Sequence, residues 1–361
     1  MYPPDSIDSI TADMKNKIIA SGVGCCLVDL LYKNIDFNSH RLTPYFSKFS
    51  GDGGLYPGKL VLQEDFEKFS QTGLDSFMTT IAGDRDPDKI NIGGPSIVSL
   101  IHASQMTNPQ ECEIHFYGKA GNDENGKYLE EYLARTPVFM KDFRLVDRRT
   151  PSTIVLSDPS YDNGHGERMF INTIGAAWDM KPEDLDDDFF MSDIVIFGGT
   201  AIVPNIHNNL FSLLKKAKKN GCMTIINTVY DFIHEKEAPD RRWPLGESDD
   251  TFAYTDILIT DREEARRLSG CNDIASALDF FAGKKSRTVI ITNGADDIHI
   301  YSDGSVFNTK GTFLLPVSDK IRAELKTVSA GDTTGCGDNF AGGLIGSLMN
   351  QKASGTSQPD L

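Results

Sequence analysis

Short apolar runs alternate with amphipathic helical segments along most of the chain, and this alternation restricts the fold more than any other feature of the sequence. The expected strands are Lys17–Leu31, Cys112–Tyr117, Asp193–Phe197, Met223–Ile226, Ile257–Ile259 and Val289–Ile291. The expected helices are Ile97–Met106, Gly126–Arg135, Leu210–Lys219 and Arg262–Leu268. Such alternation predicts an α/β fold: a mostly parallel sheet with helices on both faces. Ligands of these sheets bind at the carboxyl ends of the strands.

Two other regions depart from this alternation. Residues 34–88 are rich in glycine, proline and polar side chains, and we expect short strands there with one helix over Gln63–Phe77. Thr153–Ser157 and Arg168–Thr173 flank a polar turn, which is typical of a β-hairpin. His299–Tyr301 is expected to return antiparallel to the strand at Val289–Ile291.

Composition excludes several classes of protein. The 361 residues carry a formal charge of −16, whereas a protein that binds nucleic-acid backbones needs a basic face. No apolar run approaches the roughly 20 residues of a membrane span, and the first residues contain no signal-peptide core. The six cysteines are scattered, without a disulfide framework or a CxxC pair. We therefore expect a cytoplasmic protein that binds neither nucleic acid nor membrane.

The segment Gly331–Asp338 carries the strongest chemical signal. Helically spaced apolar residues follow it, so Gly335, Cys336 and Gly337 should lie at a helix N-terminus. Unpaired N–H groups and the helix dipole favour an anion there, and glycine lets the backbone approach that anion closely. Asp338, in the first turn, can accept a proton from an attacking hydroxyl group. The segment therefore suits phosphoryl transfer.

A simpler interpretation is that Asp338 only caps a helix and that the glycines only form a turn. Gly342, Gly343 and Gly346 inside the helix weigh against it. Each lowers helix stability by up to about 1 kcal/mol relative to alanine, so some group is expected to approach the helix closely.

Asp332–Asp338 resembles the C-terminal signature of the ribokinase-like (PfkB) carbohydrate kinases, in which alanine or glycine is more usual than Cys336. The resemblance implies a ribokinase-like α/β fold with a small β lid over the substrate. It also implies an ATP-dependent kinase that uses Mg²⁺. Asp338 would be the catalytic base, and Gly335–Gly337 would form the anion hole for the transferred phosphoryl group.

The same resemblance assigns substrate-binding residues nearer the N-terminus. Asp29 corresponds to the family's hydroxyl-binding aspartate, and Gly93-Gly94 corresponds to a glycine pair that touches the substrate. The asparagine usual four residues after that pair is Val98 here. Nucleoside kinases of the family carry another asparagine where this chain has Cys25.

Further residues resemble the family's metal and nucleotide sites. Asp261 and Glu264 resemble its Asn-x-x-Glu motif, which orders Mg²⁺ largely through water, with Asp261 in place of the asparagine. A carboxylate still suits a hard cation, although the same two residues could simply begin a helix. The resemblance implies nucleotide contacts from three further residues, Thr292, Gly294 and Thr333. It also implies that Asp332 contributes to a site for a monovalent cation such as K⁺.

The expected core kinase domain comprises residues 17–33, 93–150 and 176–361. The expected lid comprises residues 34–92 and 151–175, and residues 1–16 form an N-terminal extension. The long first lid segment resembles adenosine kinases more than ribokinase, and a lid with open sheet edges could pair into a homodimer. Only 23 residues follow Asp338, fewer than is usual, so we expect a truncated product or a weaker nucleotide site.

Three functions remain open from the sequence. The first is phosphorylation of a hydroxyl group on a sugar or sugar-like alcohol. The second is phosphorylation of a nucleoside, which the long lid segment favours. The third is ligand binding by a catalytically impaired member of the fold, which the departures from the family pattern favour.

Overall fold

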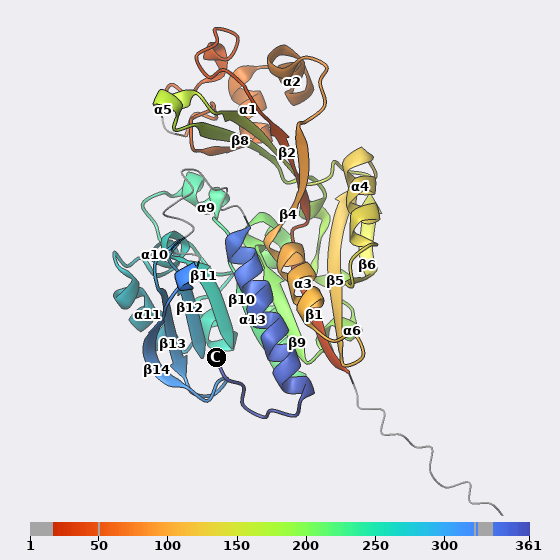
Figure 1. Cartoon of the computed structure of the whole chain (residues 1–361), viewed down its shortest axis with the longest axis vertical. Helices are drawn as coiled ribbons and strands as arrows, with labels where there is room; N and C mark the ends of the chain where they lie inside the picture. The colour runs from red at the N-terminus through yellow and green to blue at the C-terminus, as the bar shows by residue number, and fades with distance from the viewer. Residues whose placement is uncertain (1–16, 50, 321–322, 324–334) are drawn as a thin grey trace, which may run out of the picture.

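Two β-sheets organise the molecule, a large one of nine strands and a small one of five (Figure 1). The computed structural model describes residues 17–49, 51–320, 323 and 335–361. The small sheet lies above one end of the large one and forms a lid over it (Figure 1). The predicted α/β architecture with a small β lid is confirmed.

The large sheet is built almost entirely from parallel strands. In spatial order its strands are β14 (Lys310–Leu315), β13 (Ile298–Asp303), β12 (Thr288–Thr292), β11 (Ile257–Asp261), β10 (Met223–Asn227), β9 (Ile194–Gly198), β1 (Ile18–Gly24), β5 (Cys112–Gly121) and β6 (Phe139–Val146). Neighbouring strands are parallel except β12–β13 and β13–β14, so the predicted antiparallel return after β12 is confirmed. The buried central strands are nearly all apolar, as parallel strands covered on both faces require.

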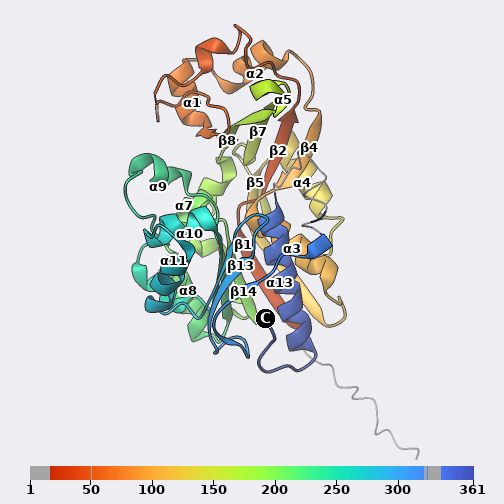
Figure 2. The same ribbon diagram turned by 60° about the vertical axis from the view of Figure 1, so that its left-hand side comes forward.

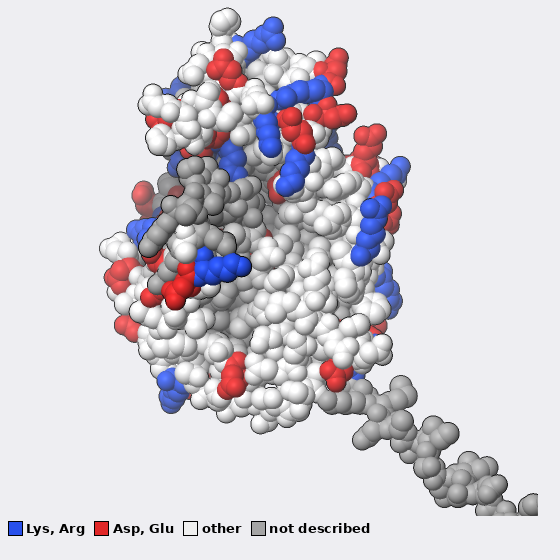
Figure 3. All heavy atoms as spheres, in the orientation of Figure 1, with Lys and Arg blue, Asp and Glu red and all other residues white. Residues whose placement is uncertain are grey.

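Helices cover both faces of this sheet (Figures 1 and 2). One face packs against α6 (Asp187–Phe190), α7 (Pro204–His207), α8 (Leu210–Lys219), α10 (Arg262–Ser269) and α11 (Ile274–Gly283). The other face packs against α3 (Pro95–Met106), α4 (Glu124–Leu133) and α13 (Cys336–Ala353). The space-filling view shows that the surface over α3 and α13 carries few charged side chains (Figure 3). Among the described residues, no helix combines the length and apolarity that crossing a bilayer requires.

The lid is a mixed sheet backed by helices of its own. Its strands, in spatial order, are β3 (Leu60–Leu62), β8 (Glu167–Thr173), β7 (Ser152–Asp158), β2 (Leu27–Tyr32) and β4 (Lys89–Gly93). The predicted hairpin of β7 and β8 is confirmed. Helices α1 (Gln63–Ser70) and α2 (Leu74–Ala82) bury Phe66 and Phe77 against one face of the sheet. The short helices α5 (Tyr161–Gly164) and α9 (Phe232–Glu237) lie in connecting segments of the chain.

Two expectations about element boundaries are wrong. The single strand expected at Lys17–Leu31 is two strands, β1 and β2, which belong to different sheets. The apolar run hides this break, which falls at Cys25 and Cys26. It directly follows Gly24, where φ is +156° and an added Cβ would lie 2.0 Å from the carbonyl oxygen of Gly198. Strand β2 therefore belongs to the small sheet, although the predicted core segment 17–33 included it. The helix expected at Gln63–Phe77 is also two helices, α1 and α2.

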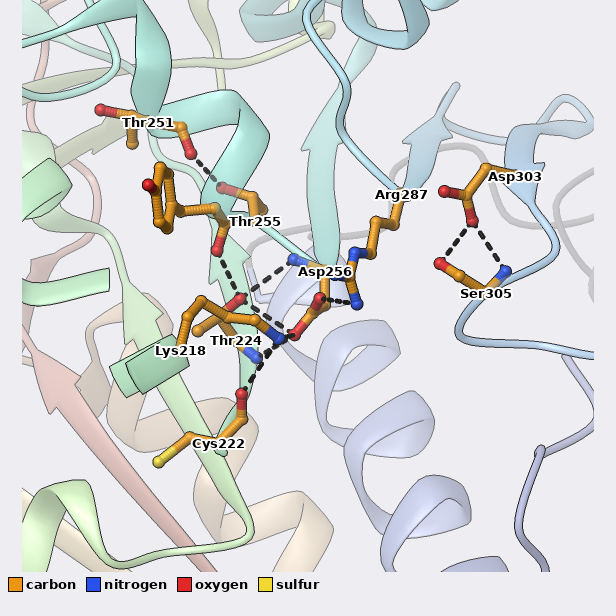
Figure 4. Close-up of polar contacts among 10 residues, drawn as sticks. Lys218, Cys222, Thr224, Thr251, Thr255, Asp256, Arg287, Asp303 and Ser305 are labelled. Carbon is orange, nitrogen blue, oxygen red and sulfur yellow. Dashed lines mark hydrogen bonds and ion pairs between the residues drawn. The ribbon is translucent and has the colours of Figure 1, made fainter. Parts of the chain in front are cut away.

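An ion-pair cluster around the buried carboxylate of Asp256 joins three elements at the amino ends of the strands (Figure 4). The carboxylate of Asp256 lies 2.6 Å from the Lys218 ammonium group and 3.0 Å from the Arg287 guanidinium group. The backbone N–H of Thr224 donates to the same carboxylate. Asp256 immediately precedes β11, whereas Asp261 ends it. The cluster therefore fixes the edge of the sheet opposite the edge where ligands of parallel sheets bind.

Candidate active site

Helix α13 begins with the glycines of the predicted anion hole. Gly335 is the N-cap residue with φ of +80°, a backbone conformation that glycine adopts without strain. Cys336 is exposed, and an added Cβ on Gly337 would meet no atom within 4 Å. Among the described residues, none comes within 4 Å of that Cβ, so they leave room for an anion at the first N–H groups of the helix. Asp332 and Thr333, predicted to bind a cation and the nucleotide, lie outside the described residues.

The carboxylate of Asp338 is half-buried in the first turn of α13. Burial raises its pKa to about 6, although the Asn227 side chain opposes this by donating a hydrogen bond over 3.4 Å. Asn227 ends β10, so Asp338 lies at the carboxyl edge of the large sheet. A carboxylate with this pKa is ionised at neutral pH and can still accept a proton.

Glu264 brings a second carboxylate to the same place. It is only 8% exposed, and burial, followed by the neighbouring charges of Asp261 and Asp338, raises its pKa to about 7. The hydroxyl of Thr228 and the backbone N–H of Asp261 donate to Glu264. Asp261 in turn accepts from the N–H of Glu264, so the helix-capping interpretation of this pair holds structurally.

Helix capping does not explain why three acidic side chains gather at this edge of the sheet. Among the residues that the structure describes, none of Asp261, Glu264 and Asp338 forms an ion pair. Burial also raises the pKa of Asp261, so this edge of the sheet holds acidic groups that form no ion pair within the described part of the chain. Carboxylate oxygens are the ligands that Mg²⁺ accepts, usually together with water. Asp261, Glu264 and Asp338 thus offer the type of ligand that a hydrated divalent cation accepts.

Thr292 and Gly294 lie beside this acidic group. Thr292 ends β12 and is the register partner of Asp261 on the neighbouring strand. Gly294 follows in a turn with φ of +61°, and an added Cβ there would meet no atom of the described residues within 4 Å. The structure thus brings these two residues next to the predicted metal ligands.

The predicted substrate residues meet at the junction of the two sheets. Asp29 on β2 lies against Gly93, since a Cβ on Gly93 would be 2.7 Å from the Asp29 carboxylate. Gly94 has φ of +108° and packs so closely on the chain that a Cβ would be 2.3 Å from the Cys25 carbonyl oxygen. It is the N-cap residue of α3, and α3 and α13 both begin at the end that faces the lid (Figure 1).

The glycines inside α13 have a structural cause. A Cβ on Gly342 would lie 2.5 Å from the Ser99 carbonyl oxygen, and one on Gly346 would lie 3.1 Å from the Met106 Cβ. The expected close approach is therefore confirmed, but the approaching group is helix α3. These glycines consequently provide no support for an anion site.

Two residues that shape the site were not predicted from the sequence. Asn227 donates to Asp338 and Thr228 donates to Glu264, and both lie where β10 ends. The available signal was the change from the apolar run Met223–Ile226 to two polar residues at the carboxyl end of a parallel strand.

Comparison with known proteins agrees with this arrangement. Residues 89–357 match the family described as pfkB family carbohydrate kinase. The chain is 25% identical to the fructokinase of Klebsiella pneumoniae over 236 residues, which cover 64% of this chain and 70% of that protein. It is 27% identical to the adenosine kinase of Schizosaccharomyces pombe over 273 residues, 71% and 73% of the two chains.

The fold is also similar to that of solved kinase structures. The structure of ribokinase from Thermotoga maritima superposes with a TM-score of 0.59 at 18% identity, covering 93% of this chain and 89% of that one. The fold is therefore ribokinase-like. The family match spans most of the chain and includes the glycine pair, the acidic group and the start of α13. The chain belongs to the PfkB family of carbohydrate kinases.

Proposed function

We propose that this protein transfers the γ-phosphoryl group of ATP to a hydroxyl group of a sugar or of a substrate that contains a sugar. Asp338 accepts the proton of that hydroxyl group as its oxygen bonds to the γ-phosphorus and the bond to the leaving ADP oxygen breaks. The N–H groups at Gly335–Gly337 stabilise the charge on the phosphoryl oxygens during transfer. Asp29 orients the hydroxyl groups of the substrate.

The position of Asp338 is the observation that carries this proposal. Its carboxylate occupies the first turn of the helix whose N-terminus forms the anion site, so base and anion site are adjacent. Its pKa of about 6 places it near the range in which a general base works best at neutral pH. A residue that only capped the helix would need neither the burial nor the contact with Asn227.

Asp261 and Glu264 would hold the Mg²⁺ ion of the nucleotide, in part through water. Magnesium bound there would neutralise charge that develops on the phosphate oxygens. Thr292 and Gly294 would contact the nucleotide, because they adjoin the acidic group in the sheet.

Release of ADP from Mg-ATP tests the function directly. The panel contains sugars, sugar acids, sugar phosphates and nucleosides, and at least one should stimulate ADP release. Asp338→Asn should lower kcat by about 10²- to 10⁴-fold, the usual contribution of a general base, and retain substrate affinity. Asp279→Asn, on the exposed face of α11, is the matched control and should keep full activity. Substrate binding without any ADP release, or full activity of Asp338→Asn, would refute the proposal.

A further inference from the structure

The lid presents a row of polar side chains on one face. Strand register places Asn91, Asp29, Thr153 and Asn172 side by side across β4, β2, β7 and β8. Residues directly opposite in neighbouring strands point to the same face of a sheet. Thr153 and Asn172 are only 7% and 6% exposed, and the Asn172 amide donates to the Thr153 hydroxyl over 3.0 Å. Asp29 thus belongs to a row of four side chains that can form hydrogen bonds, which we call the polar row.

The opposite face of the lid has a different character. Leu30, Ile154 and Ile171 pack there with Val61 and the helices α1 and α2. This face of the lid sheet is therefore covered by α1 and α2 and forms the apolar core of the lid. The polar row lies on the other face.

An aromatic cavity adjoins one end of the polar row. It has a volume of about 1000 Å³ and lies between the lid and the segment around α9. Leu62 and Phe170 from the lid line it, as do Tyr230 and Phe232 from the core. The rings of Tyr230 and Phe232 are 4.7 Å apart. The volume is at the upper end of the usual range for small-molecule sites.

The polar row and the cavity lie on the same face of the lid sheet. Leu62 is the register partner of Asn172, and Phe170 precedes Asn172 by two residues on the same strand, so all three side chains share a face. Figures 1 and 2 both place α9 beneath the β8 side of the lid. Charged groups also line the cavity, and one ion pair joins its two sides: Lys236 on α9 pairs with Asp65 on α1 over 2.5 Å.

A short stretch of chain connects the cavity lining to the reaction centre. Tyr230 comes three residues after Asn227, whose side chain donates to Asp338. Leu62 of the lid packs against the same core cluster as Tyr230 and Phe232. A molecule whose hydroxyl groups contacted the polar row could therefore extend an apolar part between Phe170 and Tyr230.

We propose that the sugar phosphorylated by this protein carries a planar aromatic base, so that the substrate is a nucleoside. The inference rests on the proposed function, because it assumes that Asp29 and its row bind the sugar whose hydroxyl group is phosphorylated. A free monosaccharide would occupy the polar row and leave the apolar wall of Leu62, Phe170, Tyr230 and Phe232 in water. A nucleoside matches both parts, since its ribose offers hydroxyl groups and its base stacks on aromatic rings.

The experiment compares nucleosides with monosaccharides in the full-length chain. Adenosine, guanosine, cytidine, uridine, ribose, fructose and glucose are each assayed for ADP release with Mg-ATP. Their binding is measured separately by calorimetry without ATP. At least one nucleoside should exceed ribose in kcat/KM by more than tenfold. Phe170→Ala should weaken binding of that nucleoside by about tenfold to hundredfold, as loss of base stacking does, and leave ribose binding within twofold.

Phe139→Ala is the matched control, because Phe139 is a half-exposed phenylalanine at a strand on the far edge of the large sheet. It should change neither activity nor binding. Asn172→Ala should weaken the binding of nucleosides and of ribose to the same extent, because it alters only the polar row, which both ligands would contact.

The results separate the two proposals. Phosphorylation of monosaccharides in preference to nucleosides would overturn the nucleoside assignment and leave the kinase function intact. An equal effect of Phe170→Ala on ribose and nucleosides would also overturn the assignment. Nucleoside binding that depends on Phe170, without ADP release from any compound, would support the assignment of the ligand and refute the proposed function.

Discussion

Replacing Glu264 by glutamine should stabilise the protein at pH 8. A carboxyl group whose pKa is about 7, against 4.5 for a free glutamate, binds its proton more tightly in the folded state than in the unfolded state. Stability therefore falls as pH rises from about 4.5 to about 7, and the loss is complete above pH 7. At 1.36 kcal/mol for each pH unit, this loss amounts to about 3 kcal/mol.

Glutamine removes the charge and retains an oxygen that can accept from Thr228 and from the Asp261 N–H. We therefore expect Glu264→Gln to raise the free energy of unfolding by about 1 to 3 kcal/mol at pH 8. Near pH 5.5 most of the wild-type carboxyl groups are protonated in the folded state, so the gain should fall to about 1 kcal/mol or less. Urea unfolding at the two pH values measures the difference. Glu263→Gln, on the exposed side of the same helical turn, should change stability by less than about 0.5 kcal/mol at either pH.

Magnesium provides an independent check. If Glu264 is a metal ligand, millimolar Mg²⁺ should raise the Tm of the wild type at pH 8 and raise that of Glu264→Gln less. The reasoning would be refuted if Glu264→Gln were less stable than the wild type at pH 8, or if its gain in stability were the same at both pH values.

Four further outcomes are expected. In steady-state assays, kcat/KM should fall about tenfold per pH unit below about pH 6, as Asp338 becomes protonated; a flat profile from pH 5 to 7 would contradict its role as base. Gly94→Ala should lower Tm and raise KM, because its backbone is left-handed and has no room for a Cβ. Gly342→Ala should cost about 1 to 3 kcal/mol in urea unfolding, whereas Gly343→Ala, whose Cβ meets only one atom at 3.8 Å, should not destabilise the protein. Asp256→Ala should cost about 1 to 3 kcal/mol, because its partners Lys218 and Arg287 are partly exposed. It should leave KM unchanged at a temperature where the variant is folded, because its cluster is at the opposite edge of the sheet.

Much of the core domain could be predicted from the sequence. There the spacing of apolar residues in each segment matches the side of the helix or strand that is buried. The helix Leu210–Lys219 is found with the predicted bounds, since one apolar face packs on the sheet and the lysines remain in water. The buried strands are equally clear, because apolar runs between polar turns have few other uses in an α/β chain. The start of α13 was evident from the glycines before a helical pattern.

The sequence could not reveal features that depend on pairing between distant segments. The run through Cys25 and Cys26 is apolar on both sides of the break, so nothing local separates β1 from β2. Asn172 and Thr153 are unremarkable residues of a hairpin until strand register places them beside Asp29. The glycines of α13 suggested a ligand, because a sequence does not show which neighbour needs the space that they leave.

The strand order of the lid has a consequence for synthesis of the chain. Strands β2 and β3 are made first, yet β7 and β8 lie between them in the finished sheet. A nascent chain that has emerged only as far as β6 cannot complete this sheet. Until β7 and β8 emerge, the edges of β2 and β3 that pair with them remain unpaired. The lid sheet can therefore be completed only after Thr173 has left the ribosome.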